Sequence, residues 1–171
     1  MGDWIEKVDF EKISPDFRCN FEGFLPIREL VESRCAEVPE KPGVYMILTM
    51  DTKTPVFNSG YPSFSNCKLP PRTPEQLATG WEPSSPVAYI GKAGGSGNNS
   101  NLRKRLSQYF DWFSGKWYRH KGGRDIWQID HPGDLLVPWR VTEEEPRFCE
   151  AMLIRKFRRE YSKRPFANHQ G

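Results

Sequence analysis

Short apolar runs alternate with polar segments along the chain and predict several β-strands. Residues 41–50 contain the run Val-Tyr-Met-Ile-Leu after a Pro-Gly pair, and residues 87–91 read Val-Ala-Tyr-Ile-Gly. Runs of this length next to turn residues are typical of strands. Residues 124–129 and 134–141 lie on either side of a turn sequence and predict two further strands. An extra hairpin formed by these two strands is one possibility.

Three segments place apolar residues at the spacing of an α-helix. They are residues 27–38, residues 98–113 and a final segment from about 146 to 161. The apolar stripe of the middle segment consists of Leu102, Leu106, Tyr109, Phe110 and Phe113. Ser100 or Asn101 is suited to cap that helix, and Pro146 is suited to the first turn of the last one. Strands and helices together predict an α+β fold.

Residues 51–86 differ from the rest of the chain because they contain seven prolines, which exclude a long helix or a central strand. We interpret them as an insertion between the first two strands. A disordered loop is one possibility, and partial packing through large apolar side chains is the other. Those side chains are Phe57, Tyr61, Phe64, Leu69 and Trp81. With an N-terminal extension of residues 1–40, we expect one domain, residues 1–171, whose core is 41–50 and 87–171.

Composition narrows the class of protein. No apolar run approaches the roughly 20 residues of a membrane span, and the first ten residues carry acids where a signal peptide needs bases. We therefore expect a cytoplasmic protein with no membrane partner. The cysteines show no metal-binding or disulfide spacing, so we expect reduced, structural thiols. They are Cys19, Cys35, Cys67 and Cys149.

The net charge of +3 is mild, but the positive charges are concentrated in residues 92–124, the basic stretch, which contains one acid, Asp111. Its cations are Lys92, Arg103, Lys104, Arg105, Lys116, Arg119, Lys121 and Arg124. Its interleaved aromatic residues are Tyr109, Trp112, Trp117 and Tyr118. Cations beside rings that can stack suit a nucleic-acid surface. A solvated helix face followed by a basic loop explains the same pattern without a ligand.

The glycine-rich residues 89–97 fit neither common nucleotide motif. A P-loop needs glycines before its lysine and a Ser or Thr after it, whereas Ala93 follows Lys92 here. A dinucleotide fingerprint would begin at Gly95, but Ser100 occupies the position of its third glycine. Lys92 instead lies at the end of a predicted strand.

Two predicted helices carry polar residues beside their apolar stripes. Arg105 and Tyr109 are four positions apart and share one side of their helix, where a surface arginine and a core tyrosine are the plain interpretations. Glu150 is the sharper exception, because it shares the face of Ile154 and Phe157 in the last helix. A carboxylate buried there needs either an arginine partner or a divalent metal ion.

Five motifs in this order resemble those of the GIY-YIG nuclease superfamily. They are Gly-Val-Tyr at 43–45, Tyr-Ile-Gly at 89–91, residues 102–109 with Arg105, residues 149–154 with Glu150, and residues 165–168 with Asn168. The resemblance covers about residues 41–171. It implies a small three-stranded antiparallel sheet flanked by helices, with Tyr45 and Tyr89 on adjacent strands that face one cleft.

The resemblance also implies roles for the charged residues. Glu150 would bind one Mg²⁺ ion, or Mn²⁺ in its place, which polarises the scissile phosphate. Arg105 would stabilise the negative charge that develops on the phosphoryl oxygens. Tyr45 would act as general base, and since a tyrosine of ordinary pKa is a poor base, Lys92 would assist it. In the plain alternative the tyrosines are structural.

Three further positions complete the implied site. Tyr89 and Tyr109 would support it by hydrogen bonding, and Asn168 would orient it. Tyr109 stands where many members of the family have histidine, so both proton transfer and plain support stay open for it.

The long insertion and the N-terminal extension resemble additions to the family's type II restriction endonucleases. We therefore expect a restriction-like enzyme acting on double-stranded DNA, with a homodimer left open. A repair or structure-specific nicking nuclease and a non-catalytic nucleic-acid-binding module are the alternatives. DNA contacts are expected from Arg103, Lys104, Lys116 and Arg119, and contacts to phosphates or base edges from Lys121, Arg124 and Gln128.

Overall fold

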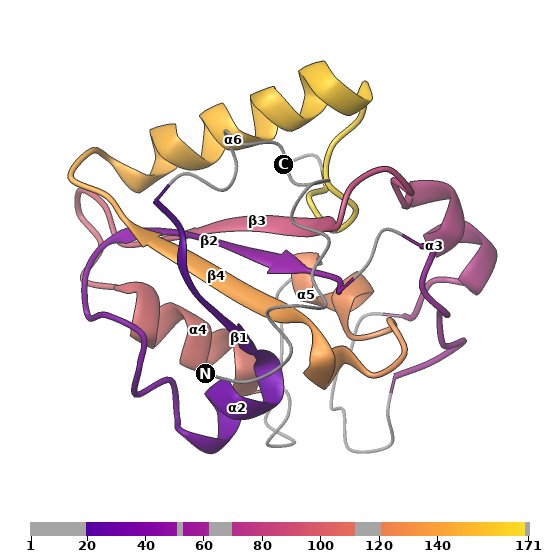
Figure 1. Ribbon diagram of the computed structural model, residues 1–171, viewed down its shortest axis with the longest axis horizontal. Helices are drawn as coiled ribbons and strands as arrows, with labels where there is room; N and C mark the ends of the chain where they lie inside the picture. The colour runs from indigo at the N-terminus through magenta and orange to yellow at the C-terminus, as the bar shows by residue number, and fades with distance from the viewer. Residues whose placement is uncertain (1–19, 51–52, 62–69, 112–120, 170–171) are drawn as a thin grey trace.

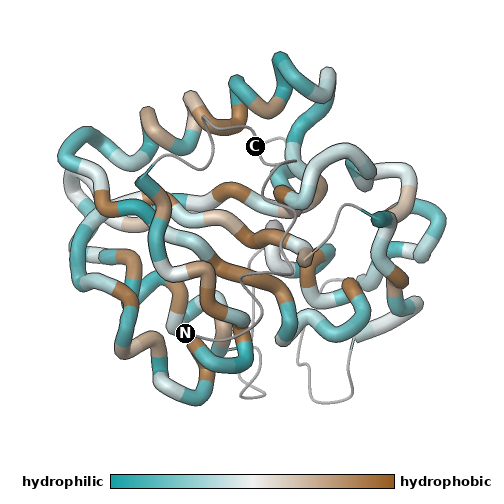
Figure 2. Tube along the Cα trace, in the orientation of Figure 1, coloured by the Kyte–Doolittle hydropathy of each residue, from teal (hydrophilic) through white to brown (hydrophobic). Residues whose placement is uncertain are grey.

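The computed structural model describes residues 20–50, 53–61, 70–111 and 121–169, with the side chains of residues 121 and 122 left out (Figure 1). These residues form an α+β fold around a four-stranded antiparallel sheet with the strand order β1-β4-β2-β3. The strands are β1 (Glu22–Pro26), β2 (Gly43–Leu48), β3 (Val87–Ala93) and β4 (Leu136–Val141). Figure 2 shows hydrophobic positions concentrated along these strands.

Helices cover both faces of the sheet. The helix α6 (Pro146–Tyr161) lies on one face, and α2 (Ile27–Glu32), α4 (Leu102–Phe110) and α5 (Lys121–Ile126) lie on the other (Figure 1). Every residue of β2 is buried because successive side chains alternate between these two faces. Val44 and Met46 pack with Phe157 of α6, whereas Tyr45 belongs to the opposite core. The motif tyrosines therefore lie on the face away from α6.

The helix boundaries follow from capping residues. Asn101 accepts a hydrogen bond from the Lys104 amide and starts α4, and Pro146 occupies the first turn of α6, both as expected. In the insertion, α3 (Pro74–Gly80) begins with a capping box of Thr73 and Gln76. A short 3₁₀ helix, η4 (Pro132–Asp134), leads into β4.

The strands predicted at 41–50 and 87–91 and the final helix are confirmed, but the three-stranded sheet is wrong. The N-terminal extension supplies β1, which pairs with β4 and adds a fourth strand. Gly23 and Phe24 have positive φ angles, and the pairing shifts register between Glu22 and Leu25. A Cβ at Gly23 would lie 2.3 Å from the ring of Trp139, so the strand bends where only glycine fits. Because of this bend, polar and apolar residues do not alternate along β1, so the sequence pattern does not predict the strand.

The helix predicted at 27–38 ends earlier, at Glu32. Arg34 and Cys35 adopt left-handed backbone conformations, which interrupt the helical hydrogen bonds. The Cys35 thiol is nevertheless buried in the core, as is that of Cys149, and both are free. Cys19 and Cys67 lie outside the described residues.

The extra hairpin is also wrong. Residues 124–129 form the end of α5 and a turn, and Ile129 makes an isolated bridge with Phe57. The sequence predicts a strand here because Ile126, Trp127 and Ile129 are apolar. In the structure Ile126 ends α5, Trp127 lies in the turn that follows and Ile129 comes after it, and all three side chains are buried in the core.

The described parts of the insertion pack on the core, which confirms partial packing. Phe57 stacks on Phe166 with ring centroids 5.4 Å apart, and both rings contact Trp81. Leu77 of α3 is fully buried. Phe64 and Leu69 lie outside the described residues. In the part of the chain that the structure describes, no helix has the length and apolar character needed to cross a membrane.

Candidate active site

Three tyrosines from three elements meet beneath the sheet. The ring centroids of Tyr45 on β2 and Tyr89 on β3 are 6.0 Å apart, and Tyr109 on α4 lies 6.2 and 5.9 Å from them. The strand register explains the meeting, because Tyr45 pairs with Gly91 and Ile47 pairs with Tyr89. The two tyrosines are thus diagonal neighbours on one face of the sheet.

Gly91 makes room for the Tyr45 ring. A Cβ at Gly91 would lie 2.5 Å from Cζ of Tyr45, 2.7 Å from its hydroxyl oxygen and 2.8 Å from Cε1 of Tyr89. Real Cβ atoms do not approach other atoms so closely. The glycine that closes the Tyr-Ile-Gly motif is therefore a packing requirement of the tyrosine cluster.

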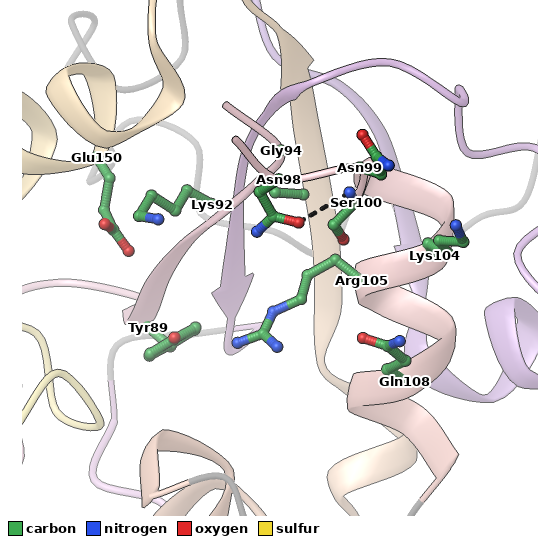
Figure 3. Close-up of a pocket in the computed structure, with 11 residues that line it drawn as sticks. Tyr89, Lys92, Gly94, Asn98, Asn99, Ser100, Lys104, Arg105, Gln108 and Glu150 are labelled. Carbon is green, nitrogen blue, oxygen red and sulfur yellow. Dashed lines mark hydrogen bonds between the residues drawn. The ribbon is translucent and has the colours of Figure 1, made fainter. Parts of the chain in front are cut away.

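A cleft of about 610 Å³ opens beside this cluster (Figure 3). Figure 3 shows Lys92 of β3 pointing toward Glu150 of α6, and Arg105 of α4 reaching toward Tyr89. The other lining residues are Ala93, Gly94, Asn98, Asn99, Ser100, Lys104 and Gln108. The structure thus brings five of the predicted site residues, from α4, α6 and β3, to one cleft: Tyr89, Lys92, Lys104, Arg105 and Glu150.

Glu150 is the half-buried acid of the cleft. Burial raises the pKa of its carboxyl group above the usual range, and the charges of Lys92 and Arg105 oppose that rise. Among the described residues, no cation forms a direct ion pair with Glu150. The carboxylate therefore has cations nearby without being neutralised by one of them, so a ligand can still reach it.

The structure offers few protein ligands for a metal ion. Within residues 20–50, 53–61, 70–111 and 121–169 no group of three or more His, Cys, Asp or Glu side chains could hold one. Glu150 is the carboxylate that lines the cleft. Mg²⁺ is often bound by one or two carboxylates together with waters and substrate phosphates, so a single glutamate fits Mg²⁺ better than a metal that needs a full protein cage.

The two strand tyrosines are strongly shifted away from ionisation. Burial raises the pKa of Tyr45, while the positive charge of the nearby Arg105 lowers it. Burial also raises the pKa of Tyr89, and the neighbouring Tyr45 and Glu150 add to the rise. Arg105 is thus the cation that acts on Tyr45, and Lys92 and Arg105 both act on Glu150, so the predicted assistance of Tyr45 by Lys92 stays a prediction.

Asn168 contacts the strand rather than the cleft. Its side-chain oxygen accepts a hydrogen bond from the Ile90 amide at 2.9 Å, and its side-chain nitrogen donates to the Ile90 carbonyl at 2.8 Å. Two positions earlier, Phe166 is buried in the core and fixes the tail. Asn168 therefore holds the segment of β3 between Tyr89 and Lys92.

Glu145 is a site-forming residue that the sequence did not reveal. Its carboxylate accepts hydrogen bonds from the Ser96 amide at 2.9 Å and from the Ser96 hydroxyl. Gly95, with a φ of +113°, would place a Cβ 2.8 Å from Glu145 Oε2. The hydrogen bonds from Ser96 lower the pKa of Glu145. This contact, the Glu145 clasp, joins the start of α6 to the loop that forms one wall of the cleft.

Some cations of the basic stretch face the cleft, and others make contacts within the fold. Lys104 is exposed on the cleft wall. Arg103 instead donates to the carbonyls of Ala36 and Val38 and pairs with Glu40. Lys116, Arg119 and the side chain of Lys121 lie outside the described residues.

Gln128 is fully buried, which overturns its predicted contact with base edges. Its amide nitrogen donates to the carbonyls of Asn58 and Arg72, and its oxygen accepts from the Arg72 amide. Arg124 pairs with Asp125 at 3.1 Å. The Gln128 side chain thus holds the insertion to the segment after α5, whereas the Arg124 contact lies within α5.

Comparison of the chain with protein-family models, with curated proteins and with solved structures finds no match. Function is therefore argued from the cleft itself.

Proposed function

We propose that this chain is a metal-dependent DNA endonuclease that hydrolyses phosphodiester bonds on a GIY-YIG-type fold. The observation that carries the proposal is Glu150, a half-buried carboxylate without a direct ion pair among the described residues, on the wall of a cleft that also exposes Lys92 and Arg105. A plain binding surface for phosphates would gain nothing from a carboxylate at this position. A metal-binding hydrolytic site needs one.

The residues divide the chemistry of hydrolysis between them. Glu150, solvent and a substrate phosphate would hold Mg²⁺, which supplies Lewis-acid polarisation of the phosphate when bound. Arg105 stabilises negative charge on the phosphoryl oxygens. Tyr45 would accept the proton of the attacking water after its own phenolic proton has passed to solvent; because its side chain is fully buried and does not line the cleft, water must enter past Tyr89 for this step. Because burial disfavours the charged form of Tyr45, Arg105 is the group that offsets this cost.

The additions outside the cleft support a restriction-like enzyme on double-stranded DNA. The N-terminal extension completes the sheet through β1, and the insertion packs on the core through Phe57 and Trp81. Additions of this kind are what the chain shares with the restriction members of the family that it resembles. A cytoplasmic location and a homodimer belong to the same proposal.

Incubation of the purified chain with supercoiled plasmid and Mg²⁺, followed by sequencing of the product ends, tests this function. Cuts at one sequence support the restriction-like enzyme, and scattered or structure-dependent nicks support the alternative nuclease. We expect Glu150→Gln to lower the rate about 100-fold or more, because several kcal/mol of transition-state stabilisation are lost. The control Glu160→Gln changes an exposed acid of the same helix and should cut normally.

Two outcomes would contradict the proposal. Cutting by Glu150→Gln at the wild-type rate would remove the metal role of Glu150. Retained DNA binding without any cutting by the wild-type chain would favour the non-catalytic binding module.

A further inference from the structure

A second group of charged side chains surrounds Asp125, at the end of α5. Arg72 Nη1 lies 3.0 Å from Asp125 Oδ2, Arg124 Nε lies 3.1 Å from Oδ1, and His169 Nε2 lies 2.9 Å from Oδ2. We call these four residues the Asp125 cluster. They come from the insertion, from α5 and from the tail after Asn168. Three segments far apart in the sequence thus converge on one carboxylate.

Burial within the cluster is uneven. The Asp125 side chain is 0% exposed, whereas the side chains of Arg72, Arg124 and His169 are 33%, 22% and 29% exposed. Burial alone would raise the pKa of Asp125, but the adjacent His169 and the hydrogen bonds from Arg124 and Arg72 outweigh it and hold the pKa below the usual range. The negative charge therefore lies inside and the positive groups form the rim.

The charges of the cluster do not balance. Within the described residues, Asp125 is the one carboxylate paired with Arg72 and Arg124, so two guanidinium groups share a single negative charge. His169 Nε2 is buried against the same carboxylate. Partly desolvated positive charge is costly without a counterion, and guanidinium groups are well shaped to bind phosphate oxygens. The rim is suited to an anion from solution.

The cluster adjoins the candidate active site. Trp127, two residues after Asp125, contacts Tyr109 with ring centroids 5.1 Å apart, and Tyr109 stacks on Tyr89. From the other side, Asn168 binds Ile90, the residue after Tyr89, and His169 follows directly. The cluster therefore borders the part of the molecule that carries Tyr89.

We propose that the rim of the Asp125 cluster binds a backbone phosphate of the DNA that occupies the cleft. Arg72 and Arg124 donate to the phosphate oxygens, His169 borders them, and the buried Asp125 carboxylate fixes the orientation of the two guanidinium groups. This inference rests on the proposed function, since it assumes that DNA is the ligand of the cleft.

Salt-dependent DNA binding tests the proposal without catalysis. Anisotropy of a fluorescein-labelled duplex would be measured with the full chain in EDTA between about 50 and 200 mM salt. The variants are Arg124→Gln and His169→Gln, which each leave Asp125 with other partners, and Arg158→Gln is a control on the exposed surface of α6. Thermal unfolding would show which variants are folded.

We expect Arg124→Gln to reduce the slope of log Kd against log salt by about 0.9 and to weaken binding several-fold, since one phosphate contact is lost. His169→Gln, which removes the ring beside Asp125 but no guanidinium group, should weaken binding less. The control should leave slope and affinity unchanged. Unchanged slopes in both folded cluster variants would overturn the proposal.

Two further arms separate the sources of phosphate and the two proposals. If inorganic phosphate raises the unfolding temperature of the wild type but not of Arg124→Gln, while the DNA slopes agree, the rim takes a free phosphate and the DNA assignment is overturned. If the wild-type chain neither binds nor cuts DNA, the proposed function fails and this inference fails with it. If the wild-type chain cuts DNA and the salt slopes of the cluster variants equal that of the wild type, the proposed function stands and the phosphate site at the Asp125 cluster is overturned.

Discussion

The carboxyl group of Glu150 lies half-buried beside the cleft, and burial raises its pKa above the usual range. The folded chain therefore holds the proton of this group more tightly than the unfolded chain does. By linkage, the free energy of unfolding falls as the pH rises from the ordinary pKa of 4.5 through the raised one. At neutral pH the charged Glu150 opposes folding, which is consistent with a residue kept for a ligand.

We predict that Glu150→Gln stabilises the fold above this pH window. The neutral amide does not have the desolvation cost of the carboxylate, so the free energy of unfolding should exceed that of the wild type at pH 7. The gain should shrink as the pH falls through the window, because the wild-type carboxyl group then becomes neutral as well. Urea unfolding at a series of pH values measures this, with Glu160→Gln as control. If the variant were less stable than the wild type at pH 7, the negative charge of Glu150 would be stabilising the fold through its attraction to Lys92 and Arg105.

Site residues could be predicted from the sequence where the signal lies in neighbouring residues of the chain. Tyr45 and Tyr89 are site candidates through the motif resemblance and Lys92 through its place at the end of a predicted strand, and the register of β2 and β3 brings the two tyrosines together. Glu145 and Asp125 were missed because their partners lie far away in the chain. Ser96 is 49 positions from Glu145, and no periodicity links them.

At the scale of elements, the Glu145 clasp connects α6 with the loop that follows β3. The loop has three glycines with positive φ, at positions 94, 95 and 97, so its own backbone does little to hold one conformation. The clasp supplies an anchor at Ser96. One wall of the cleft is thereby tied to the helix that carries Glu150.

We predict that Glu145→Gln loosens this wall. A neutral amide is a weaker acceptor for Ser96, so amide hydrogen exchange at residues 94–97 should become several-fold faster. DNA cleavage should slow while the overall fold is kept. In the wild type, acidification should have the same effect, because the charged clasp is lost as the pH falls through the lowered pKa of Glu145.

The control for this prediction is Glu143→Gln, an exposed acid just before α6. It should change neither exchange nor cleavage. Equal exchange rates in Glu145→Gln and the wild type would show that the glycine loop is ordered without the clasp.

Helices and strands could be predicted where the hydrophobic pattern is regular. They could not be predicted where tertiary contacts determine the backbone conformation. The apolar run of β2 and the spacing of α6 both gave elements close to those observed. The strand β1 bends at Gly23 to pass the Trp139 ring, so it has no alternation. In residues 124–129, buried polar partners of Asp125 and Gln128 favour a helix end and a turn over a strand.

For the whole molecule, Gln128 is the residue that joins the insertion to the rest of the fold. Its three hydrogen bonds reach Asn58 and both backbone groups of Arg72. Nearby, the Asn58 amide donates to the Gln128 carbonyl, and the Asp130 amide donates to that of Val56. Removing the side chain would leave buried backbone groups unsatisfied.

We predict that Gln128→Ala lowers the free energy of unfolding by about 2–4 kcal/mol. Residues 53–61 and 70–73 should then become sensitive to proteolysis before global unfolding. Urea unfolding and limited proteolysis measure the two effects, and Arg159→Ala, an exposed change on α6 away from the cleft lining, is the control. The fraction that remains folded should bind DNA as the wild type does. Weaker binding by a fully folded variant would restore a direct role in DNA contact.

The tail that follows α6 has a consequence for self-association. In the sheet of the described residues β3 is an edge strand, and such strands are templates for pairing with other chains. Asn168 occupies both the amide and the carbonyl of Ile90, and the Ala167 amide binds the Ala88 carbonyl, so the tail imitates a neighbouring strand. A chain that lost residues 165–169 would present this apolar edge bare, and growth of intermolecular sheets would then compete with the folded monomer.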